Sequence, residues 1–310
     1  MAFTGSVARI EAGGYRAEVA EVGAGLAGLW HDDVAVTVEM PAGELPPKST
    51  GAVLMPWPNR IRDGHYSFDG AGYQLALTEP AQRNASHGFA KWARWNATER
   101  SASAVTMAHD LVPQTGYPFE VRLQITYSVA VETGLTVSVT ATNTGSGAAP
   151  FGAGFHPYLD LGNEELDGVE LLIPAATVLD TDERQIPVGR SDVTGTPFDL
   201  RQSRPIGSLR LDHGYADLVG STAVVRSARR QAELRWDAAF GYLQVFTPPF
   251  VTPGRNAVAI EPMSCPANAF NSGEGLVRLE PGATWLGEWG IRLLAEQPAA
   301  ARQPRLRSAL

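Results

Sequence analysis

The chain is poor in cysteine and in long apolar runs. Its 310 residues include a single cysteine, Cys265, so no internal disulfide or redox pair of thiols can form, and a reducing compartment is expected. No apolar run reaches the roughly 20 residues of a membrane-spanning helix. The first residues lack a basic start followed by an apolar segment, so no signal peptide is predicted. These absences predict a cytoplasmic protein without a membrane partner, in which Cys265 is a buried structural residue rather than a nucleophile.

Positive charge is scarce as well. Lys and Arg together number 25 against 33 Asp and Glu, which gives a formal net charge of −8. Proteins that bind bulk nucleic acid or anionic membranes are more often basic, so both partners are disfavoured. The segment His31-Asp32-Asp33 has the spacing of no common zinc or calcium loop and is interpreted as a solvated turn. No metal is predicted.

No long stretch carries apolar residues at helical spacing, and strand-like alternation dominates instead. Apolar residues alternate with polar ones from Leu123 to Val129, and again from Leu135 to Ala141, which predicts a β-hairpin with one buried face. Further short strands are expected at 34–38, 74–77, 169–173, 223–225, 234–236, 243–246 and 258–260. Separated by many of the 32 Gly and 22 Pro, they predict an all-β sandwich or barrel. We expect one domain, residues 1–296, and a disordered tail, residues 297–310.

A glycine-rich segment near the start of the chain raises the question of a nucleotide cofactor. Gly23-Ala-Gly25-Leu-Ala-Gly28 matches the G-x-G-x-x-G fingerprint of dinucleotide-binding folds. That fingerprint must open a helix, whereas here Leu29-Trp30-His31-Asp32-Asp33 and a short β-branched run follow. The segment is therefore interpreted as a turn between strands, and no cofactor is predicted.

Four short motifs each place one polar side chain among aromatic, Gly or Pro residues. The motifs are Pro56-Trp57-Pro58-Asn59-Arg60-Ile61, Ser86-His87-Gly88-Phe89, Gly154-Phe155-His156-Pro157-Tyr158 and Ile260-Glu261-Pro262. Together they offer an arginine, two histidines and a carboxylate. Such a set suits acid–base chemistry on a polar organic molecule.

Each of these side chains also has an ordinary structural interpretation. Arg60 can hold hydroxyls or an anion with its guanidinium fork, or it can form a surface salt bridge. His87 and His156 can exchange protons near pH 7, or they can be hydrogen-bonded core residues. Glu261 ends an apolar run; at the end of a buried strand its pKa would rise and make it a better base, but a strand-end salt bridge is the alternative. Asp212 either accepts hydrogen bonds from hydroxyls or lies in a solvated turn.

The order of these motifs resembles the aldose 1-epimerase (mutarotase) family. The resemblance extends from about Gly23 to Trp289. It is carried by Pro56-Trp-Pro-Asn-Arg-Ile61 with Gly64-His-Tyr-Ser-Phe68-Asp-Gly70, His87-Gly-Phe89 with Trp92, Phe155-His-Pro-Tyr158, Asp212-His-Gly-Tyr215, and Ile260-Glu-Pro262 with Ala269-Phe-Asn271. The resemblance implies a β-supersandwich of large, mostly antiparallel sheets with a site in a cleft on one side. It also implies cofactor-free interconversion of the α and β anomers of a free aldose.

The resemblance assigns roles to five residues. Glu261 matches the family's general base and His156 its general acid. His87, Arg60 and Asp212 match substrate-binding positions, with His87 close to the reacting centre. The substrate implied is a small free sugar, bound by a monomer or a homodimer.

The chemistry of ring opening explains these residue types. Glu261 would take the proton of the anomeric hydroxyl, while a charged His156 on the opposite side of the carbon would give a proton to the ring oxygen. The ring opens to the aldehyde, C1 rotates about the C1–C2 bond, and closure with reversed roles gives the other anomer. Trp57, Phe89 or Tyr158 could stack on the apolar face of the sugar.

Departures from the family pattern bear on the substrate. Many members have a second Gly after the first histidine, where this chain has Phe89. The pair Trp57-Pro58 is similar to a bacterial subgroup whose diverse sugars include a sulfonated hexose. Two alternatives therefore stay open: an epimerase for a sulfonated or phosphorylated hexose, with Arg62 or Arg94 as the cation, and a non-catalytic sugar-binding module on the same fold.

Overall fold

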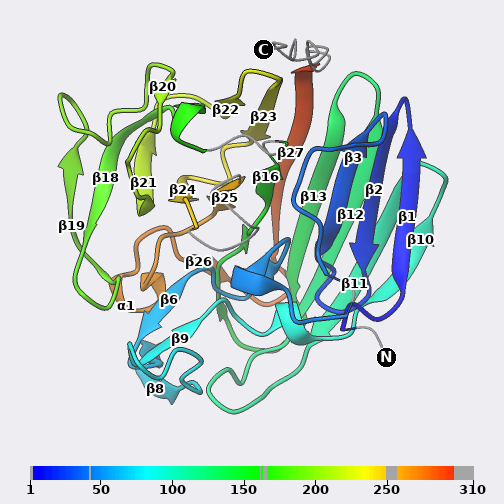
Figure 1. Ribbon diagram of the computed structural model, residues 1–310. Helices are drawn as coiled ribbons and strands as arrows, with labels where there is room; N and C mark the ends of the chain where they lie inside the picture. The colour runs from blue at the N-terminus through cyan, green and yellow to red at the C-terminus, as the bar shows by residue number, and fades with distance from the viewer. Residues whose placement is uncertain (1–2, 42, 161, 163–165, 249–256, 297–310) are drawn as a thin grey trace, which may run out of the picture.

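The computed structural model describes residues 3–41, 43–160, 162, 166–248 and 257–296, so the predicted tail 297–310 lies outside the described residues. Strands dominate these residues and form sheets of nine, eight and four strands, with three two-stranded ladders (Figure 1). Every pairing within the sheets is antiparallel, which confirms the prediction of an all-β fold with large antiparallel sheets. The boundary of a single domain at residue 296 stays a prediction.

The nine-stranded sheet contains the predicted hairpin at its centre. Ile125 and Val139 are directly paired and buried, and the alternation of the two strands buries one face of the hairpin, as expected. In sheet order the strands are β10 (Asn96–Arg100), β11 (Ala104–Leu111), β12 (Val121–Ala130), β13 (Gly134–Asn143), β27 (Thr284–Glu296), β23 (Arg230–Trp236), β22 (Thr222–Arg226), β17 (Glu170–Leu172) and β20 (Arg204–Pro205).

The four-stranded sheet packs against one end of the nine-stranded sheet, where β1 and β2 contact β12 (Figure 1). Its strands are β1 (Val7–Ala12), β2 (Tyr15–Ala20), β3 (Leu26–His31) and β4 (Val34–Ala35). The glycine-rich segment leads from a turn directly into β3, a strand, so its interpretation as a turn is confirmed. Buried Ile10, Leu29 and Tyr127 join the two sheets in one apolar core.

The eight-stranded sheet covers the other half of the molecule. In sheet order it contains β19 (Pro187–Asp192), β18 (Ala175–Thr181), β21 (Asp212–Leu218), β24 (Tyr242–Phe246), β25 (Ala257–Met263), β15 (Gly154–Phe155) and β5 (Val53–Leu54), with β16 (Tyr158–Asp160) also paired to β25. The strand predicted at 258–260 extends through Met263, so Glu261 lies within a strand and not at its end.

Short elements connect the sheets. The two-stranded ladders are β6 (Arg60–Arg62) with β9 (Asn84–Ser86), β7 (His65–Phe68) with β8 (Ala71–Gln74), and β14 (Ala149–Phe151) with β26 (Val277–Leu279). Single helical turns occur at η1 (Pro47–Ser49), η2 (Ala90–Trp92), η3 (Leu166–Gly168) and α1 (Ala269–Ser272). The strand predicted at 74–77 is wrong beyond its first residue, because β8 ends at Gln74.

Two further observations concern the single cysteine and the absence of a membrane-spanning helix. Cys265 is buried, and burial raises the pKa of its thiol to about 12, which fits the predicted structural role. In the described part of the chain no helix is long and apolar enough to cross a membrane.

Candidate active site

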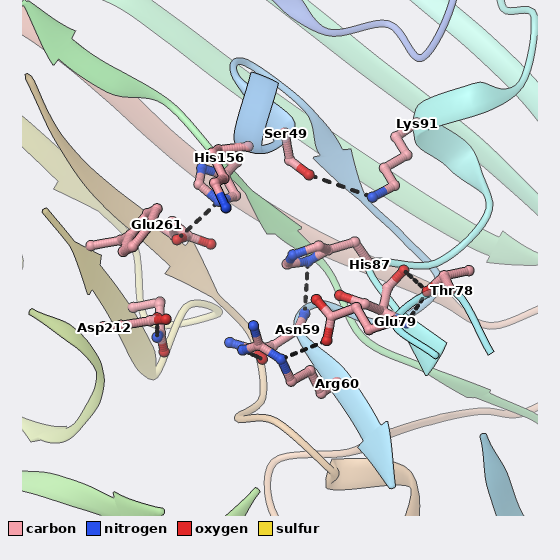
Figure 2. Close-up of a pocket in the computed structure, with 14 residues that line it drawn as sticks. Ser49, Asn59, Arg60, Thr78, Glu79, His87, Lys91, His156, Asp212 and Glu261 are labelled. Carbon is pink, nitrogen blue, oxygen red and sulfur yellow. Dashed lines mark hydrogen bonds and ion pairs between the residues drawn. The ribbon is translucent and has the colours of Figure 1, made fainter. Parts of the chain in front are cut away.

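Three neighbouring strands of the eight-stranded sheet place polar side chains on one face. Gln244 on β24 is directly opposite Glu261 on β25, and Phe246 on β24 is opposite Asp212 on β21. Because alternate residues of a strand share a face, Gln244 and Phe246 point the same way. Gln244 Nε2 donates to Asp212 Oδ1 at 2.7 Å, which joins the carboxylate to the row. The register of the sheet therefore brings two carboxyl groups onto one wall of a cavity (Figure 2).

His156 faces Glu261 across a break in the same sheet. Strands β15 and β16 both pair with β25, and the register across the gap between them sets His156 opposite Glu261. His156 Nε2 lies 3.2 Å from Glu261 Oε1. The backbone N–H of His156 donates to the Ala52 carbonyl and its own carbonyl accepts from the Gly51 N–H, both at 3.0 Å. The ring of Tyr158 stacks on the imidazole at 5.0 Å, so the histidine is fixed in position from both its backbone and its ring.

The opposite wall comes from the β6–β9 ladder. Asn59 and His87 flank this ladder in left-handed conformations, with φ of 55° and 64°. The His87 N–H donates to the Asn59 carbonyl at 2.9 Å, and the Asn59 N–H donates to His87 Nδ1 at 3.2 Å. Since Nδ1 accepts, the hydrogen of the neutral ring lies on Nε2, which can donate to a ligand.

Arg60 projects from the same wall and is held by two partners. Its Nε donates to Glu79 Oε2 at 2.8 Å, and its Nη1 donates to Asn59 Oδ1 at 3.2 Å. Two oxygens thus fix the plane of the guanidinium (Figure 2). An arginine held in this way can present its remaining N–H groups to sugar hydroxyls without losing further side-chain entropy.

The walls enclose a cavity of about 280 Å³. That is near the lower limit of the roughly 300–1,000 Å³ typical of ligand pockets, so it suits a molecule of monosaccharide size. It is lined by Lys48, Ser49, Asn59, Arg60, Thr78, Glu79, Ser86, His87, Lys91, His156, Asp212, Gln244, Phe246 and Glu261. No three His, Cys, Asp or Glu side chains of the described residues are grouped so that they could hold a metal ion.

Burial controls the protonation of the site. Burial, followed by the charge of Lys91, lowers the pKa of His156 to about 3, and the same causes lower the pKa of His87 well below its usual value. Burial and the nearby Asp212 raise the pKa of Glu261 well above its usual value. In the free protein the proton of the His156–Glu261 pair therefore lies on the carboxyl group. The prediction of a charged His156 differs from this, because it assumed a solvated imidazole.

The five residues predicted for catalysis and sugar binding lie together, since Glu261, His156, His87, Arg60 and Asp212 all line the cavity. Their side chains come from three different strands and two loops, and they point toward one another (Figure 2). The roles assigned to these residues stay predictions. Their convergence supplies the geometry that those roles require.

The three aromatic residues predicted to stack on the sugar lie behind the cavity wall. Trp57 is 3% exposed and packs edge-on against Phe89 at 4.8 Å. Tyr158 is buried under His156, and its hydroxyl donates to the Lys48 carbonyl at 3.0 Å. None of the three lines the cavity, whereas Phe246 does.

The candidate cations for an anionic sugar are also placed elsewhere. Arg62 forms an ion pair with Asp182, and exposed Arg94 forms one with Glu21. Neither lines the cavity. The chain has only two lysines, Lys48 and Lys91, and both line it.

Several lining residues were missed from the sequence. Gln244 could have been found from the sequence, because it is a polar residue inside the apolar run 243–246. In the structure its side chain is only 7% exposed, and a buried polar group requires a partner. Asn59 belongs to one of the four motifs but carries no predicted role, although its backbone fixes His87. Glu79 and Lys91 lie in segments with no distinguishing pattern, and only the fold shows that they reach the cavity.

Comparison with known proteins agrees with this fold. The sequence model of the aldose 1-epimerase family matches residues 6–292. The protein YihR of Escherichia coli K12, itself described as uncharacterized, is 36% identical over 90% of each chain. Galactose mutarotase of Sus scrofa is 29% identical over 51% of this chain and 46% of the pig protein.

Solved structures share the fold. A GalM/aldose epimerase homologue from C. elegans superposes with a TM-score of 0.84 at 19% identity, covering 94% of this chain and 99% of the other. A galactose mutarotase-like protein from Clostridium acetobutylicum gives a TM-score of 0.80 at 19% identity, covering 93% and 94%. Fold, site and family match together define an isomerase that acts on carbohydrates. The chain belongs to the aldose 1-epimerase family.

Proposed function

We propose that this protein interconverts the α and β anomers of a free aldohexose similar to glucose or galactose, with Glu261 and His156 as the catalytic pair. The observation that carries the proposal is a carboxyl group and an imidazole 3.2 Å apart on the wall of a cavity of monosaccharide size. Binding alone requires no such pair, whereas opening a hemiacetal requires one proton to be removed and one to be given.

The anomeric hydroxyl and the ring oxygen are both bonded to C1, so two groups in contact can reach both oxygens. This arrangement replaces the expected one, with acid and base on opposite sides of the carbon. A hydroxyl that donates to Glu261 favours its ionised form, since hydrogen bonds to a carboxylate stabilise the charge. The carboxyl proton then passes to His156 Nε2 over the 3.2 Å contact. Because the pKa of His156 is lowered, the resulting imidazolium is a strong acid toward the weakly basic ring oxygen.

Ring opening follows with all protons accounted for. Glu261 accepts the proton of the anomeric hydroxyl, His156 gives its proton to the ring oxygen, and the bond between C1 and the ring oxygen breaks to give the aldehyde. Rotation about the C1–C2 bond presents the other carbonyl face. On closure Glu261 gives its proton to the carbonyl oxygen, while His156 accepts the proton of the hydroxyl that attacks C1. Transfer of this proton from His156 back to Glu261 restores the starting pair. Arg60, Asp212 and the Nε2–H of His87 hold the ring hydroxyls throughout.

The proposal is tested by following freshly dissolved α-D-glucose and α-D-galactose by polarimetry or NMR. We expect the purified protein to shorten the approach to anomeric equilibrium in proportion to its concentration. A measurable sugar Kd without any acceleration would contradict the proposal and favour the sugar-binding module instead.

A second candidate substrate is a hexose with an anionic substituent, and Lys91 is the observation that favours it. Lys91 lies half-buried in the cavity wall, and no described carboxylate lies within ion-pairing distance of its Nζ, which donates only to Ser49 Oγ at 3.4 Å. Burial lowers its pKa to about 8, so the ammonium form still predominates near neutral pH. A half-buried ammonium group that has no described ion-pair partner would gain from a negatively charged ligand.

If the substrate is anionic, the Lys91→Met variant should lose roughly 30-fold or more in kcat/KM for a hexose charged at C6, since removal of one partner of a buried charge pair costs about 2–5 kcal/mol. Glucose should change only a few-fold. Arg94→Met, which removes an exposed cation outside the cavity, is the matched control. Equal losses on charged and neutral sugars would contradict the anionic candidate.

A further inference from the structure

The turn between β18 and β19 contacts the wall of the cavity that is formed by the β6–β9 ladder and carries Arg60. Arg184, in this turn, is a poorly exposed arginine with a side-chain exposure of 20%. Its Nε donates to the Gln82 carbonyl at 2.7 Å, and its Nη2 donates to the Arg83 carbonyl at 2.8 Å. Nη2 also donates to Asp63 Oδ1 at 3.1 Å. One guanidinium thus holds two backbone carbonyls and a carboxylate that lie about a hundred residues away in the chain.

The bound segment is the turn that carries Glu79. Backbone bonds between Glu79 and Asn84, at 3.0 and 3.2 Å, close the base of this turn. Its tip, with Gln82 and Arg83, is exposed, and the carbonyls that Arg184 binds lie there. Asn84 Nδ2 donates in return to the Arg184 carbonyl at 2.9 Å. Without Arg184, the tip would keep the ion pair of Arg83 with Asp63 and the backbone bonds within the turn, but both of its carbonyls would lose their donor.

The contacts continue from this turn to the sugar site. Glu79 Oε2 accepts from Arg60 Nε at 2.8 Å, and Arg60 lines the cavity. A second tie runs in parallel, since Arg62, two residues from Arg60, forms an ion pair with Asp182 of the β18–β19 turn. Asp182 Oδ1 in turn accepts the backbone N–H groups of Arg184 and Ile186, both at 3.0 Å, which fixes the turn itself.

We propose that Arg184 is a positioning residue for sugar binding, which acts by holding the 79–84 turn so that Glu79 fixes the guanidinium of Arg60 toward the cavity. Arg184 does not line the cavity, so its effect must pass through Glu79 and Arg60. The proposal rests on the proposed function only for the identity of the ligand. If Arg60 binds the sugar equally in the ground state and the transition state, loss of Arg184 raises KM and leaves kcat nearly unchanged.

The test is a double-mutant cycle between Arg184→Ala and Arg60→Ala, read out as KM, kcat and sugar Kd on folded protein. We expect Arg184→Ala to raise KM and Kd roughly tenfold and to change kcat less than about twofold, because small misplacements of a binding group are costly. In the Arg60→Ala background the same substitution should add nothing. An equal factor in both backgrounds would overturn the proposal.

The matched control is Arg201→Ala. Arg201 makes three side-chain hydrogen bonds, to both oxygens of Asp199 and to Thr194, but these lie away from the cavity. It should leave KM unchanged; a rise equal to that of Arg184→Ala would overturn the proposal.

Hydrogen exchange provides a readout independent of any sugar. The backbone amides of residues 78–84 should exchange faster in Arg184→Ala than in the wild type. Unchanged exchange would overturn the proposal even if no sugar were turned over. Faster exchange together with absent mutarotation would instead retain the positioning role and reject the proposed function.

Discussion

Replacement of Glu261 by Gln is expected to lower kcat for anomer interconversion by roughly 10³-fold, within the range of about 10²–10⁴ typical of general acid–base groups. The amide has nearly the same shape as the carboxyl group, so Gln244 and Asp212 should keep their positions. An amide can donate and accept hydrogen bonds, but it cannot take a proton from a hydroxyl and later return it. The loss should therefore fall on kcat, while sugar Kd changes little. Polarimetry at saturating sugar and a direct Kd measurement separate the two.

A matched control for this substitution is Glu288→Gln. Glu288 is an exposed carboxylate on β27 that accepts from the Ser138 hydroxyl, so the same chemical change there removes a charge far from the cavity. It should leave kcat within about twofold of the wild type. A Glu261→Gln variant that retains more than a tenth of wild-type kcat would reject the assignment of Glu261 as a proton-transfer group.

Residue types, more than geometry, could be predicted from the sequence. Glu261 and His156 were selected because each stands among apolar, Gly or Pro residues, and both line the cavity. Their direct contact depends on a break between β15 and β16 and on the register of β25, which no local pattern reveals. The placement on opposite sides of a carbon was assumed from the reaction, whereas the sheet register sets the two groups side by side.

The aromatic residues show a different limit. Trp57, Phe89 and Tyr158 follow or precede polar site residues in the chain, and closeness in sequence suggested closeness to the sugar. Tyr158 is two residues from His156 and lies on the same side, but it stacks on the imidazole, which separates it from the cavity. Phe89 follows His87 and Gly88, both with positive φ, so the alternation of an extended segment does not hold there and Phe89 packs on Trp57 instead. Phe246 lies two residues after Gln244 in the regularly paired strand β24, so it shares the face of Gln244 and lines the cavity.

Long-range contacts account for the rest. The alternation at 123–141 predicted the β12–β13 hairpin correctly because hairpin pairing is local. Lys91 and Glu79 have no such local signal, since their function as wall residues depends on how distant segments pack. Arg184 is the extreme case, because its partners lie about a hundred residues away.

The buried pair of Glu261 and His156 should make the free energy of unfolding depend on pH, and Glu261→Gln should remove the part that comes from the carboxyl group. The pKa of Glu261 is raised by burial above its usual value of 4.5, so between pH 4.5 and that raised value the folded state binds more protons than the unfolded state. The free energy of unfolding contributed by this group is therefore fully present below pH 4.5 and is lost as pH rises, by about 1.4 kcal/mol per pH unit until the folded pKa is passed. His156 acts in the opposite direction, because its pKa of about 3 in the folded state removes stability as pH falls below about 6.5.

A glutamine at position 261 resembles the protonated carboxyl group at every pH. The Glu261→Gln variant should therefore match the wild type near pH 4.5 and become progressively more stable than it toward neutral pH, in urea unfolding followed at several pH values. Glu288→Gln, whose carboxylate is exposed, should show no such divergence. A difference between Glu261→Gln and the wild type that stays constant from pH 4.5 to 8 would mean that the carboxyl group is not desolvated in the folded protein. The base would then lack the raised pKa from which the proposed mechanism starts. A difference that grows with pH would mean that burial of the ionisable carboxyl group lowers the free energy of unfolding toward neutral pH, as the proposed mechanism requires.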